Sequence, residues 1–445
     1  MIAGTGRKRA ALLLLAAAAL FFLYFFGLTR TGLIGPDEAR YAAIGRAMAQ
    51  TGDWITPRLW GEPWFEKPAL LYWMTAAGFK LRLGAELAPR LPVALASVAF
   101  LIYFFVALRR EFGERAAWYA AAILATSAGW LAYSHIALTD LPMSAAFAAA
   151  MLTIFSPLAG RRSFIAAGVL LGIAVLAKGL VPLVLFLPAL WFLRKRIADL
   201  AILFAAALVV AAPWYALVTL RNGKPFLDDF FWKHHFGRFL HSALQHQQPV
   251  WFYVPVLLAG LFPWTPLLAL LFKRKLYADQ RVMFLAVWLA WGFLFFSLSR
   301  NKLPGYLLPM LPAVAALAGV ALSTRGQVRY WLAGCGALLS LAPPIIAVLP
   351  EALANGISHT PFHLGFWTVV EAVGLAVICG AIGRPWGVAA LVTVTVVLMV
   401  WNVFPQLDRR LSGRLAGSIT CLPQTSRSQR YSLEYYAGRK LTDCK

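Results

Sequence analysis

The sequence predicts an all-α protein that crosses a membrane many times, and its composition is the first reason. Of the 445 residues, 61% are hydrophobic and only 13% are charged, whereas about a quarter of the residues in a soluble domain are charged. Many apolar stretches reach or approach the ~20 residues that a helix needs to cross a bilayer. These stretches lack the alternating pattern of membrane β-barrels, so we expect the spans to be helices.

Clusters of Lys and Arg predict how these helices are oriented. In a soluble protein the formal net charge of +23 would suggest a nucleic-acid partner. Here basic clusters, such as those at 7–9, 109–115 and 194–196, separate the apolar stretches. Short cytoplasmic loops collect Lys and Arg in this way. We therefore expect contacts with membrane lipids and no nucleic-acid partner.

This alternation of apolar stretches and basic clusters predicts about thirteen transmembrane helices within residues 1–404 and a short outer tail at 405–445. The apolar stretch 10–28 is longer than the core of a typical signal peptide, so we expect it to be retained as the first helix. It leads into a first outer loop at 29–88, whose Trp and Phe residues are typical of helices that lie in the membrane interface. A second long outer segment, the fourth outer loop, spans 221–250.

The four cysteines fall into two groups. Cys335 and Cys379 lie in apolar stretches and are expected to be packing residues. Cys421 and Cys444 lie in the polar tail. If that tail is outside the cytoplasm it is in an oxidising compartment, so we predict a disulfide between them.

Ionisable residues in the predicted outer loops form the candidate site, because charge at the level of a membrane is costly and indicates function. The topology places five such segments on one side: 35–41, 61–68, 138–142, 233–239 and 300–306. Together they offer carboxylates, His, Lys and Arg. Glu and His suit a divalent metal ion, and basic side chains suit phosphate, so the mixture predicts chemistry on a phosphodiester or pyrophosphate-like leaving group.

Each of these residues also has an ordinary structural explanation. Asp37 and Asp140 could stabilise the N-termini of the helices that follow them. The pair at 234–235 could be interfacial histidines. Lys67, Lys178 and Lys302 could extend toward lipid head groups. The functional interpretation therefore rests on the residues jointly.

Three motifs in the first outer loop resemble those of the bacterial aminoarabinose lipid A transferases. They are Gly-Pro-Asp-Glu-Ala-Arg-Tyr from Gly35, Gly-Asp-Trp-Ile-Thr-Pro-Arg-Leu from Gly52, and Phe-Glu-Lys-Pro-Ala-Leu-Leu-Tyr-Trp from Phe65. The similarity continues in order through 139–142, 177–179, 235–239 and 302–309. That family belongs, with the protein O-mannosyltransferases, to the GT-C superfamily. Its members usually carry a larger periplasmic domain than the segment 405–445.

The resemblance implies a GT-C fold, with its active site on the periplasmic face of a bacterial inner membrane. It implies a polyprenyl-phosphate sugar donor and inverting transfer. By matching motifs, Asp37 and Asp140 resemble catalytic aspartates, and Glu66 and His235 resemble ligands of a divalent cation (Zn, Mg or Mn). The residues that resemble donor- or substrate-binding groups are Lys67, Arg238, Lys302, Tyr306, Arg40, Tyr41 and Lys178.

The expected reaction is attack of an acceptor oxygen on the anomeric carbon, displacing polyprenyl phosphate. The sugar that the resemblance implies is 4-amino-4-deoxy-L-arabinose or a related one. Lipid A, another glycolipid and a protein hydroxyl are all compatible acceptors, the last as in a protein O-mannosyltransferase. A lipid-linked-sugar flippase or transporter is a different class, and it would place ionisable residues near the membrane midplane within inverted repeats. A scaffold protein would not need Asp37, Glu66, His235 and Arg238 together. We expect a monomer.

Overall fold

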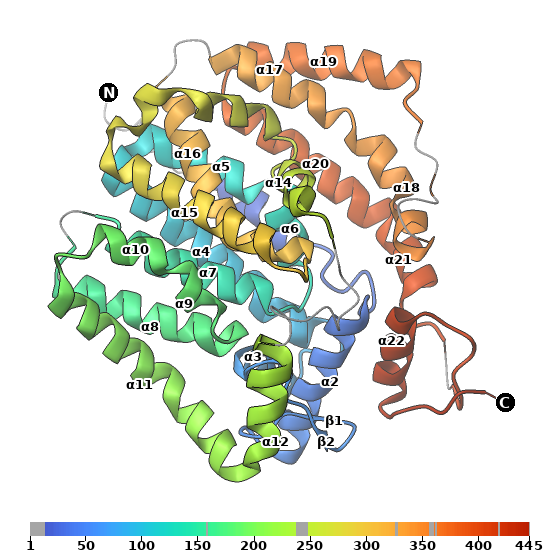
Figure 1. Cartoon of the computed structure of the whole chain (residues 1–445). Helices are drawn as coiled ribbons and strands as arrows, with labels where there is room; N and C mark the ends of the chain where they lie inside the picture. The colour runs from blue at the N-terminus through green and yellow to red at the C-terminus, as the bar shows by residue number, and fades with distance from the viewer. Residues whose placement is uncertain are drawn as a thin grey trace.

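The protein is described by a computed structural model, shown in Figure 1. The structure describes residues 14–156, 159–236, 248–324, 328–355, 360, 363–416 and 419–444, with the backbone alone at 234–236 and 355. Almost every element is a helix, as predicted. Among the described residues the named strands form one short antiparallel pair, β1 (Arg58–Leu59) with β2 (Glu62–Pro63).

The first outer loop contains two helices, as expected from its aromatic residues. They are α2 (Pro36–Thr51) and α3 (Leu70–Lys80), joined by the β1–β2 hairpin. Proline at the first position of α2 suits a helix start, because its fixed φ is helical and its missing N–H would have no partner there. Gly52, with φ 72°, ends the helix in the left-handed conformation that glycine adopts readily. The two helices pack on each other at one end of the molecule (Figure 1).

Long apolar helices form the body of the protein. In the described part of the chain, six segments are long and apolar enough to cross a bilayer, or seven if the bent pair 250–260 and 265–272 is one span. The six are Leu87–Phe112, Ile197–Asn222, Gln280–Leu298, Pro304–Ser323, Val328–Ala354 and Pro385–Asn402. Large apolar side chains such as Val209, Val377 and Trp401 point outward and are more than half exposed. Such a surface is typical of helices that face lipid.

Every span predicted from the sequence overlaps a helical segment, but several of these segments are short or broken. The third predicted span, 116–133, is interrupted at Thr126 and Ser127, whose hydroxyls donate to the backbone carbonyls of Ala122 and Ile123. The sixth predicted span, between Gly179 and Arg194, is split into two short helices. Each has a proline in its first turn, where the missing N–H is tolerated. The exact number of membrane crossings, about thirteen, therefore stays a prediction.

The first described helix is the apolar segment Leu14–Tyr24, and the remaining helices follow in chain order. They are α4 (Leu87–Phe112), α5 (Glu114–Ala125), α6 (Ala128–Ser134), α7 (Asp140–Ile154), α8 (Arg161–Lys178), α9 (Val181–Leu185), α10 (Leu187–Phe192), α11 (Ile197–Asn222), α12 (Lys224–Leu227), η1 (Asp228–Phe236), η2 (Val250–Phe252), α14 (Tyr253–Gly260), η3 (Thr265–Phe272), η4 (Arg274–Ala278), α15 (Gln280–Leu298), η5 (Pro304–Met310), α16 (Leu311–Ser323), α17 (Val328–Leu339), α18 (Ala342–Asn355), α19 (Phe366–Ile382), α20 (Pro385–Asn402), α21 (Phe404–Leu411) and α22 (Arg427–Ala437).

The helix α16 lies at the centre of this body. Within the segment Pro304–Ser323, 94% of the most apolar window is buried, and α16 packs against α5. A side chain at Gly319 would place its Cβ 2.5 Å from the backbone nitrogen of Ala120. The glycine therefore allows the two helices to approach closely. The preceding segment η5 is held against α7, which brings Tyr306 to the start of that helix.

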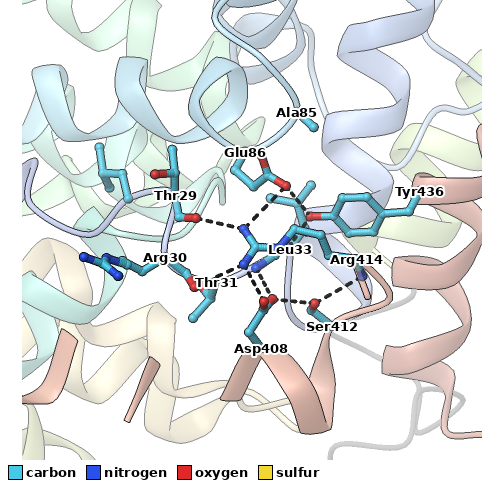
Figure 2. Close-up of polar contacts among 12 residues, drawn as sticks. Thr29, Arg30, Thr31, Leu33, Ala85, Glu86, Asp408, Ser412, Arg414 and Tyr436 are labelled. Atoms are coloured by element: carbon cyan, nitrogen blue, oxygen red, sulfur yellow. Dashed lines mark hydrogen bonds and ion pairs between the residues drawn. The ribbon is translucent and has the colours of Figure 1, made fainter. Parts of the chain in front are cut away.

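The tail folds back onto the first outer loop, and α2 lies between α3 and α22 (Figure 1). Figure 2 shows the polar contacts that join the two segments. The N–H of Gly32 donates to Asp408 Oδ1 over 2.6 Å, and Arg414 donates to the carbonyl of Thr29 over 2.9 Å. The loop and the tail therefore lie on the same side of the protein, as the alternating basic clusters predicted. The Cys421–Cys444 disulfide is also confirmed, with Cα atoms 5.0 Å apart.

Candidate functional site

Two neighbouring carboxylates at the start of α2 lie in opposite environments. The side chain of Asp37 is 41% exposed, whereas Glu38 is 1% exposed. Neither makes a side-chain cap at Gly35, although the N–H of Ile34 donates to Glu38 Oε2 over 2.9 Å. Asp37 is thus the carboxylate of this pair that a substrate can reach, and Glu38 belongs to the interior.

Glu38 forms a buried ion pair with Arg90 of α4. The guanidinium donates to both oxygens of Glu38, over 2.7 and 2.8 Å. Its other N–H groups donate to the carbonyls of Leu28, Thr31 and Gly32. A buried charge requires this degree of pairing, since an unpaired one is strongly unfavourable. Arg90 therefore holds the chain that leads into Asp37.

Arg40, one turn after Asp37, joins the first outer loop into a cluster of charges. Its Nη2 pairs with Asp37, and its Nη1 lies 3.3 Å from Glu66 Oε2. Glu66 Oε1 lies 3.3 Å from Lys67 Nζ. Burial acts to lower the pKa of Arg40, but the charges of Glu66 and Asp37 outweigh it and hold that pKa above its ordinary value. Arg40 is therefore a permanent cation shared by two carboxylates.

Aromatic rings surround this guanidinium. Its Cζ lies 5.3 Å from the ring centroid of Trp64 and 6.0 Å from that of Tyr41. A third ring comes from the tail, where Tyr431 lies 5.0 Å away. Tyr41 is buried and packs edge-on against Tyr72. It lies behind Arg40 in the core, and its predicted contact with substrate stays a prediction.

A second cluster forms where α7, α8 and η5 meet. Lys178 Nζ donates to Asp140 Oδ1 over 2.5 Å, and it lies 4.8 Å from the ring centroid of Tyr306. Gly305 permits this arrangement, because a Cβ there would lie 2.6 Å from Asp140 Oδ1 and 2.6 Å from the hydroxyl of Tyr133. Asp140, Lys178 and Tyr306, all predicted site residues, are thus in contact although any two of them are at least 38 positions apart in the sequence.

The two clusters are neighbours. The N–H of Ala137, just before α7, donates to Glu38 Oε1 over 3.0 Å, which joins the segment before Asp140 to the start of α2. Tyr133 lies within range of the charges of both Asp140 and Asp37. Three carboxylates, Asp37, Glu66 and Asp140, therefore gather with three cations at one end of the molecule.

Lys302 is placed differently from the lysines of the clusters. It is 4% exposed, and its ammonium donates to the carbonyls of Ser299 and Gln248. Burial lowers the pKa of Lys302. The residue closes the turn between α15 and η5 and touches the end of the fourth outer loop, so its role toward the donor stays a prediction.

The remaining two predicted residues belong to the fourth outer loop. Arg238 and the side chain of His235 lie outside the described residues. Their predicted roles in phosphate and metal binding are therefore untested by this geometry.

The predicted metal site is incomplete in the part of the chain that the structure describes. There, no group of three or more His, Cys, Asp and Glu side chains could hold a metal ion. Glu66 itself is next to two cations, Arg40 and Lys67. The described donors do not by themselves fit a divalent ion, and the metal stays a prediction that depends on His235.

Sequence reasoning missed three residues of the site. Arg90 directly precedes the second predicted span (91–108), and an arginine at that position was a signal that could have been followed. Tyr133 ends a predicted span and carried no charge to single it out. Tyr431 lies about 390 residues after Arg40, and no local pattern links the two.

Comparison with known proteins identifies relatives. The family model described as dolichyl-phosphate-mannose-protein mannosyltransferase matches residues 66–222. The undecaprenyl phosphate-alpha-4-amino-4-deoxy-L-arabinose arabinosyl transferase of Pseudomonas aeruginosa is 35% identical over 350 residues, which are 73% of this chain and 62% of that protein. The enzyme of the same name from Erwinia tasmaniensis is 30% identical over 463 residues, covering 93% of this chain and 80% of that one. This chain thus spans less than two thirds of the Pseudomonas protein.

Solved structures of related proteins have the same fold as this chain. The crystal structure of ArnT from Cupriavidus metallidurans bound to undecaprenyl phosphate superposes with a TM-score of 0.75 at 28% identity, covering 97% of this chain and 85% of that one. The archaeal oligosaccharyltransferase AglB from Archaeoglobus fulgidus, at 13% identity, shares only the fold, with a TM-score of 0.56. The GT-C fold and the multi-pass membrane character are confirmed. The chain belongs to the family of undecaprenyl phosphate-aminoarabinose arabinosyl transferases.

Proposed function

We propose that the protein is an inverting glycosyltransferase that moves a sugar from a polyprenyl-phosphate donor to an envelope acceptor. One observation carries the proposal: Asp37, Glu66 and Asp140 gather with Arg40, Lys67 and Lys178 at one end of a lipid-facing helical body. Family membership supports it, since the relatives are named for transfer from undecaprenyl phosphate-aminoarabinose. The sugar proposed is 4-amino-4-deoxy-L-arabinose.

The reaction forms one bond and breaks one. An acceptor oxygen attacks the anomeric carbon while the bond from that carbon to the phosphate oxygen breaks, and the electron pair leaves with polyprenyl phosphate. A hydroxyl acceptor must also lose its proton, and the exposed carboxylate of Asp37 is the base within reach. An acceptor phosphate is already anionic and needs only to be oriented.

Cations at the site stabilise the leaving group. Negative charge on the phosphate grows as the bond breaks, so fixed positive groups near it lower the barrier. Lys67 and Lys178 have mostly buried side chains, and their ammonium groups pair with Glu66 and Asp140. Arg238 is proposed as a further phosphate contact on the strength of its motif. Each carboxylate partner holds the ammonium of its lysine in place.

A divalent cation at Glu66 and His235 is a separate part of the proposal. When bound, such an ion would supply additional positive charge to a phosphate. Metal analysis of the purified protein tests it directly. We expect bound metal in the wild type and its loss in Glu66→Gln and His235→Ala, and a metal-free wild type would contradict it.

We propose further that the site faces the periplasm of a bacterial inner membrane. Basic clusters on alternate loops support this orientation, and a disulfide in the tail suits an oxidising compartment. Cysteine-accessibility labelling in intact cells tests it. Single cysteines introduced near Asp53 and near Arg427 should both react with an impermeant reagent, while a single cysteine near Lys195 should not.

A protein hydroxyl is the second candidate acceptor. The family model that matches residues 66–222 is named for transfer of mannose to protein, which favours this alternative over a transporter. Mass spectrometry of lipid A and of envelope proteins and glycans, with and without the gene, distinguishes the two. We expect an aminoarabinose-sized addition on lipid A that depends on the gene. Unchanged lipid A with gene-dependent protein glycans would favour the alternative, and no change in either would contradict the proposed function.

A further inference from the structure

We propose that the C-terminal tail completes the active site, with Tyr431 as a positioning residue that holds Arg40 against Asp37. The inference rests on the proposed function, because it assigns Asp37 a role in the transfer. The family motifs lie within the first 310 residues and do not include the tail.

The first observation is the contact itself. Arg40 is 4% exposed, and its two terminal nitrogens face Asp37 and Glu66. The ring of Tyr431 lies 5.0 Å from its Cζ, which is within the range of a cation–π contact. A guanidinium that is held by aromatic rings loses freedom to rotate. The tail therefore helps to keep the Arg40–Asp37 pair in one geometry.

The second observation is that α22 is firmly attached beside the site. Ser432, next to Tyr431, donates to the carbonyl of Leu33 over 2.8 Å and accepts from the N–H of Gly413. The hydroxyl of Tyr436 accepts from the N–H of Leu33 and donates to Glu86 (Figure 2). Two of these bonds end at the backbone of Leu33, four residues before Asp37. Tyr431 thus lies on a helix that is hydrogen-bonded to the first outer loop, just before Asp37.

The third observation concerns the same stretch of backbone. Arg90 binds the carbonyls of Thr31 and Gly32 from inside the protein, and Asp408 accepts from the N–H of Gly32 from the tail. Asp408 in turn pairs with Arg414 and accepts from Ser412 (Figure 2). The segment before Asp37 is therefore clamped from both sides, and removal of the tail would release one of them.

The ring of Tyr431, rather than its hydroxyl, is the part that acts. Among the described residues its hydroxyl makes no hydrogen bond, while the ring contacts Arg40 and, at 6.0 Å, Arg427. Tyr431→Phe should therefore preserve the contact and Tyr431→Leu should remove it. A purely structural role would predict instead that any change on this face of α22 has the same effect.

Tyr435 offers a matched control on the same helix. Its ring lies 3.8 Å from Arg46, and its hydroxyl donates to the carbonyl of Ala85. It fastens α22 to α2 in the same way, but it touches neither Arg40 nor Asp37 in these contacts. Tyr435→Leu thus reports the cost of loosened docking alone.

The test measures kcat and the donor KM for these variants of the full-length protein in proteoliposomes, with undecaprenyl phosphate-aminoarabinose and lipid A. We expect Tyr431→Leu to lower kcat by about 2- to 30-fold with little change in KM, the range of one cation–π contact. We expect Tyr431→Phe to stay within about twofold of the wild type and Tyr435→Leu to affect kcat less than Tyr431→Leu. Equal losses in Tyr431→Leu and Tyr435→Leu, or a normal kcat in Tyr431→Leu, would overturn the inference.

A structure of Tyr431→Leu by electron cryomicroscopy gives a readout that does not depend on activity. We expect the guanidinium of Arg40 to move away from Asp37 while α22 stays docked. An unmoved Arg40 would overturn the inference even if no acceptor proves active. A wild-type protein that transfers sugar to neither lipid A nor protein would instead count against the proposed function.

Discussion

Asp37 and Glu38 illustrate how adjacent, chemically similar residues divide their roles. The exposed Asp37 meets Arg40, and the buried Glu38 meets Arg90. A helix turns about 100° per residue, so neighbours point to different faces. One carboxylate is left for chemistry, and the other stabilises the turn that presents it.

Replacement of Glu38 should therefore affect folding first. Glu38→Gln leaves Arg90, which is 4% exposed, without its charged partner. Breaking a buried ion pair costs about 3–5 kcal/mol, so we expect a clear loss of stability in denaturant unfolding. Glu62→Gln, on the exposed strand β2, is the control and should change stability by less than about 0.5 kcal/mol. Equal stability of the two variants would contradict the assignment.

Gly305 should be required for activity on steric grounds. A methyl group in Gly305→Ala would lie 2.6 Å from Asp140 Oδ1, so the carboxylate or the turn must move. Misplacement of a reacting group by about 1 Å can cost roughly 100-fold in rate, and we expect a kcat loss of that order. Gly374→Ala is the control, because open space surrounds that glycine. A normal kcat in Gly305→Ala would show that Asp140 does not need this position.

If Lys302 binds the donor, its lowered pKa predicts that donor binding depends on pH. Burial lowers its pKa, so as pH rises it loses its proton, and with it its charge, earlier than an ordinary lysine. An ammonium has three donors, and the carbonyls of Gln248 and Ser299 accept from it, which leaves one for a phosphate. The affinity for undecaprenyl phosphate should fall as pH rises through that lowered pKa. Below it, binding should be constant.

Lys302→Arg provides the control, since arginine stays charged throughout this range. The phosphate has its second pKa near ~6 and does not change charge at alkaline pH. Equilibrium binding between about pH 7 and pH 10 should show the loss in the wild type and its absence, or a shift to higher pH, in the variant. Identical profiles would remove Lys302 from the donor site.

At the scale of elements, the tail is the unit whose role the sequence did not reveal. Its disulfide joins residues 23 positions apart and encloses α22. Closing such a loop restricts the unfolded tail and, in the chain-entropy model, stabilises it by about 3 kcal/mol. The tail has too few residues to form a large core of its own, so the disulfide and the contacts with α2 together keep it folded.

Removal of the disulfide should therefore loosen α22 selectively. In the double variant Cys421→Ser, Cys444→Ser we expect amide hydrogen exchange in α22 to become roughly 100-fold faster, as about 3 kcal/mol implies. Exchange in α16 should stay unchanged. Cys335→Ala, in α17, is the control and should leave α22 protected. Unaltered exchange in α22 would show that docking alone holds the tail.

The all-helical fold class was predicted from the sequence and is confirmed, whereas the roles of the predicted site residues stay predictions. Motifs at Asp37, Glu66 and Asp140 are continuous in sequence, so each could be recognised locally, and the topology placed them on one side. The pairing of Lys178 with Asp140, which joins two helices, and of Arg40 with Glu66, which joins α2 to the loop before α3, depends on tertiary packing that hydropathy does not encode. Broken spans, such as that at Thr126, were missed because side-chain hydroxyls replace backbone hydrogen bonds there.

At the scale of the whole molecule, a lipid-facing helical body carries a small charged site at one end. Apolar side chains face outward on α11, α19 and α20. The cluster of Asp37 lies at the start of α2, and the cluster of Asp140 lies next to it. This arrangement suits a substrate whose long chain is in the lipid and whose phosphate and sugar are at its edge. Parts of the chain that are far apart in sequence build the site: the first outer loop, the start of α7 with the end of α8, η5 and the tail.

The most direct test compares Asp37→Asn with the wild type in proteoliposomes that contain undecaprenyl phosphate-aminoarabinose and lipid A, measuring sugar transfer and binding of undecaprenyl phosphate together. Asparagine keeps the size of the side chain and removes its charge. We predict that the wild type transfers the sugar, and that Asp37→Asn loses about 10²- to 10⁴-fold in rate while binding is retained. Transfer by Asp37→Asn at a rate close to the wild type's would contradict the account.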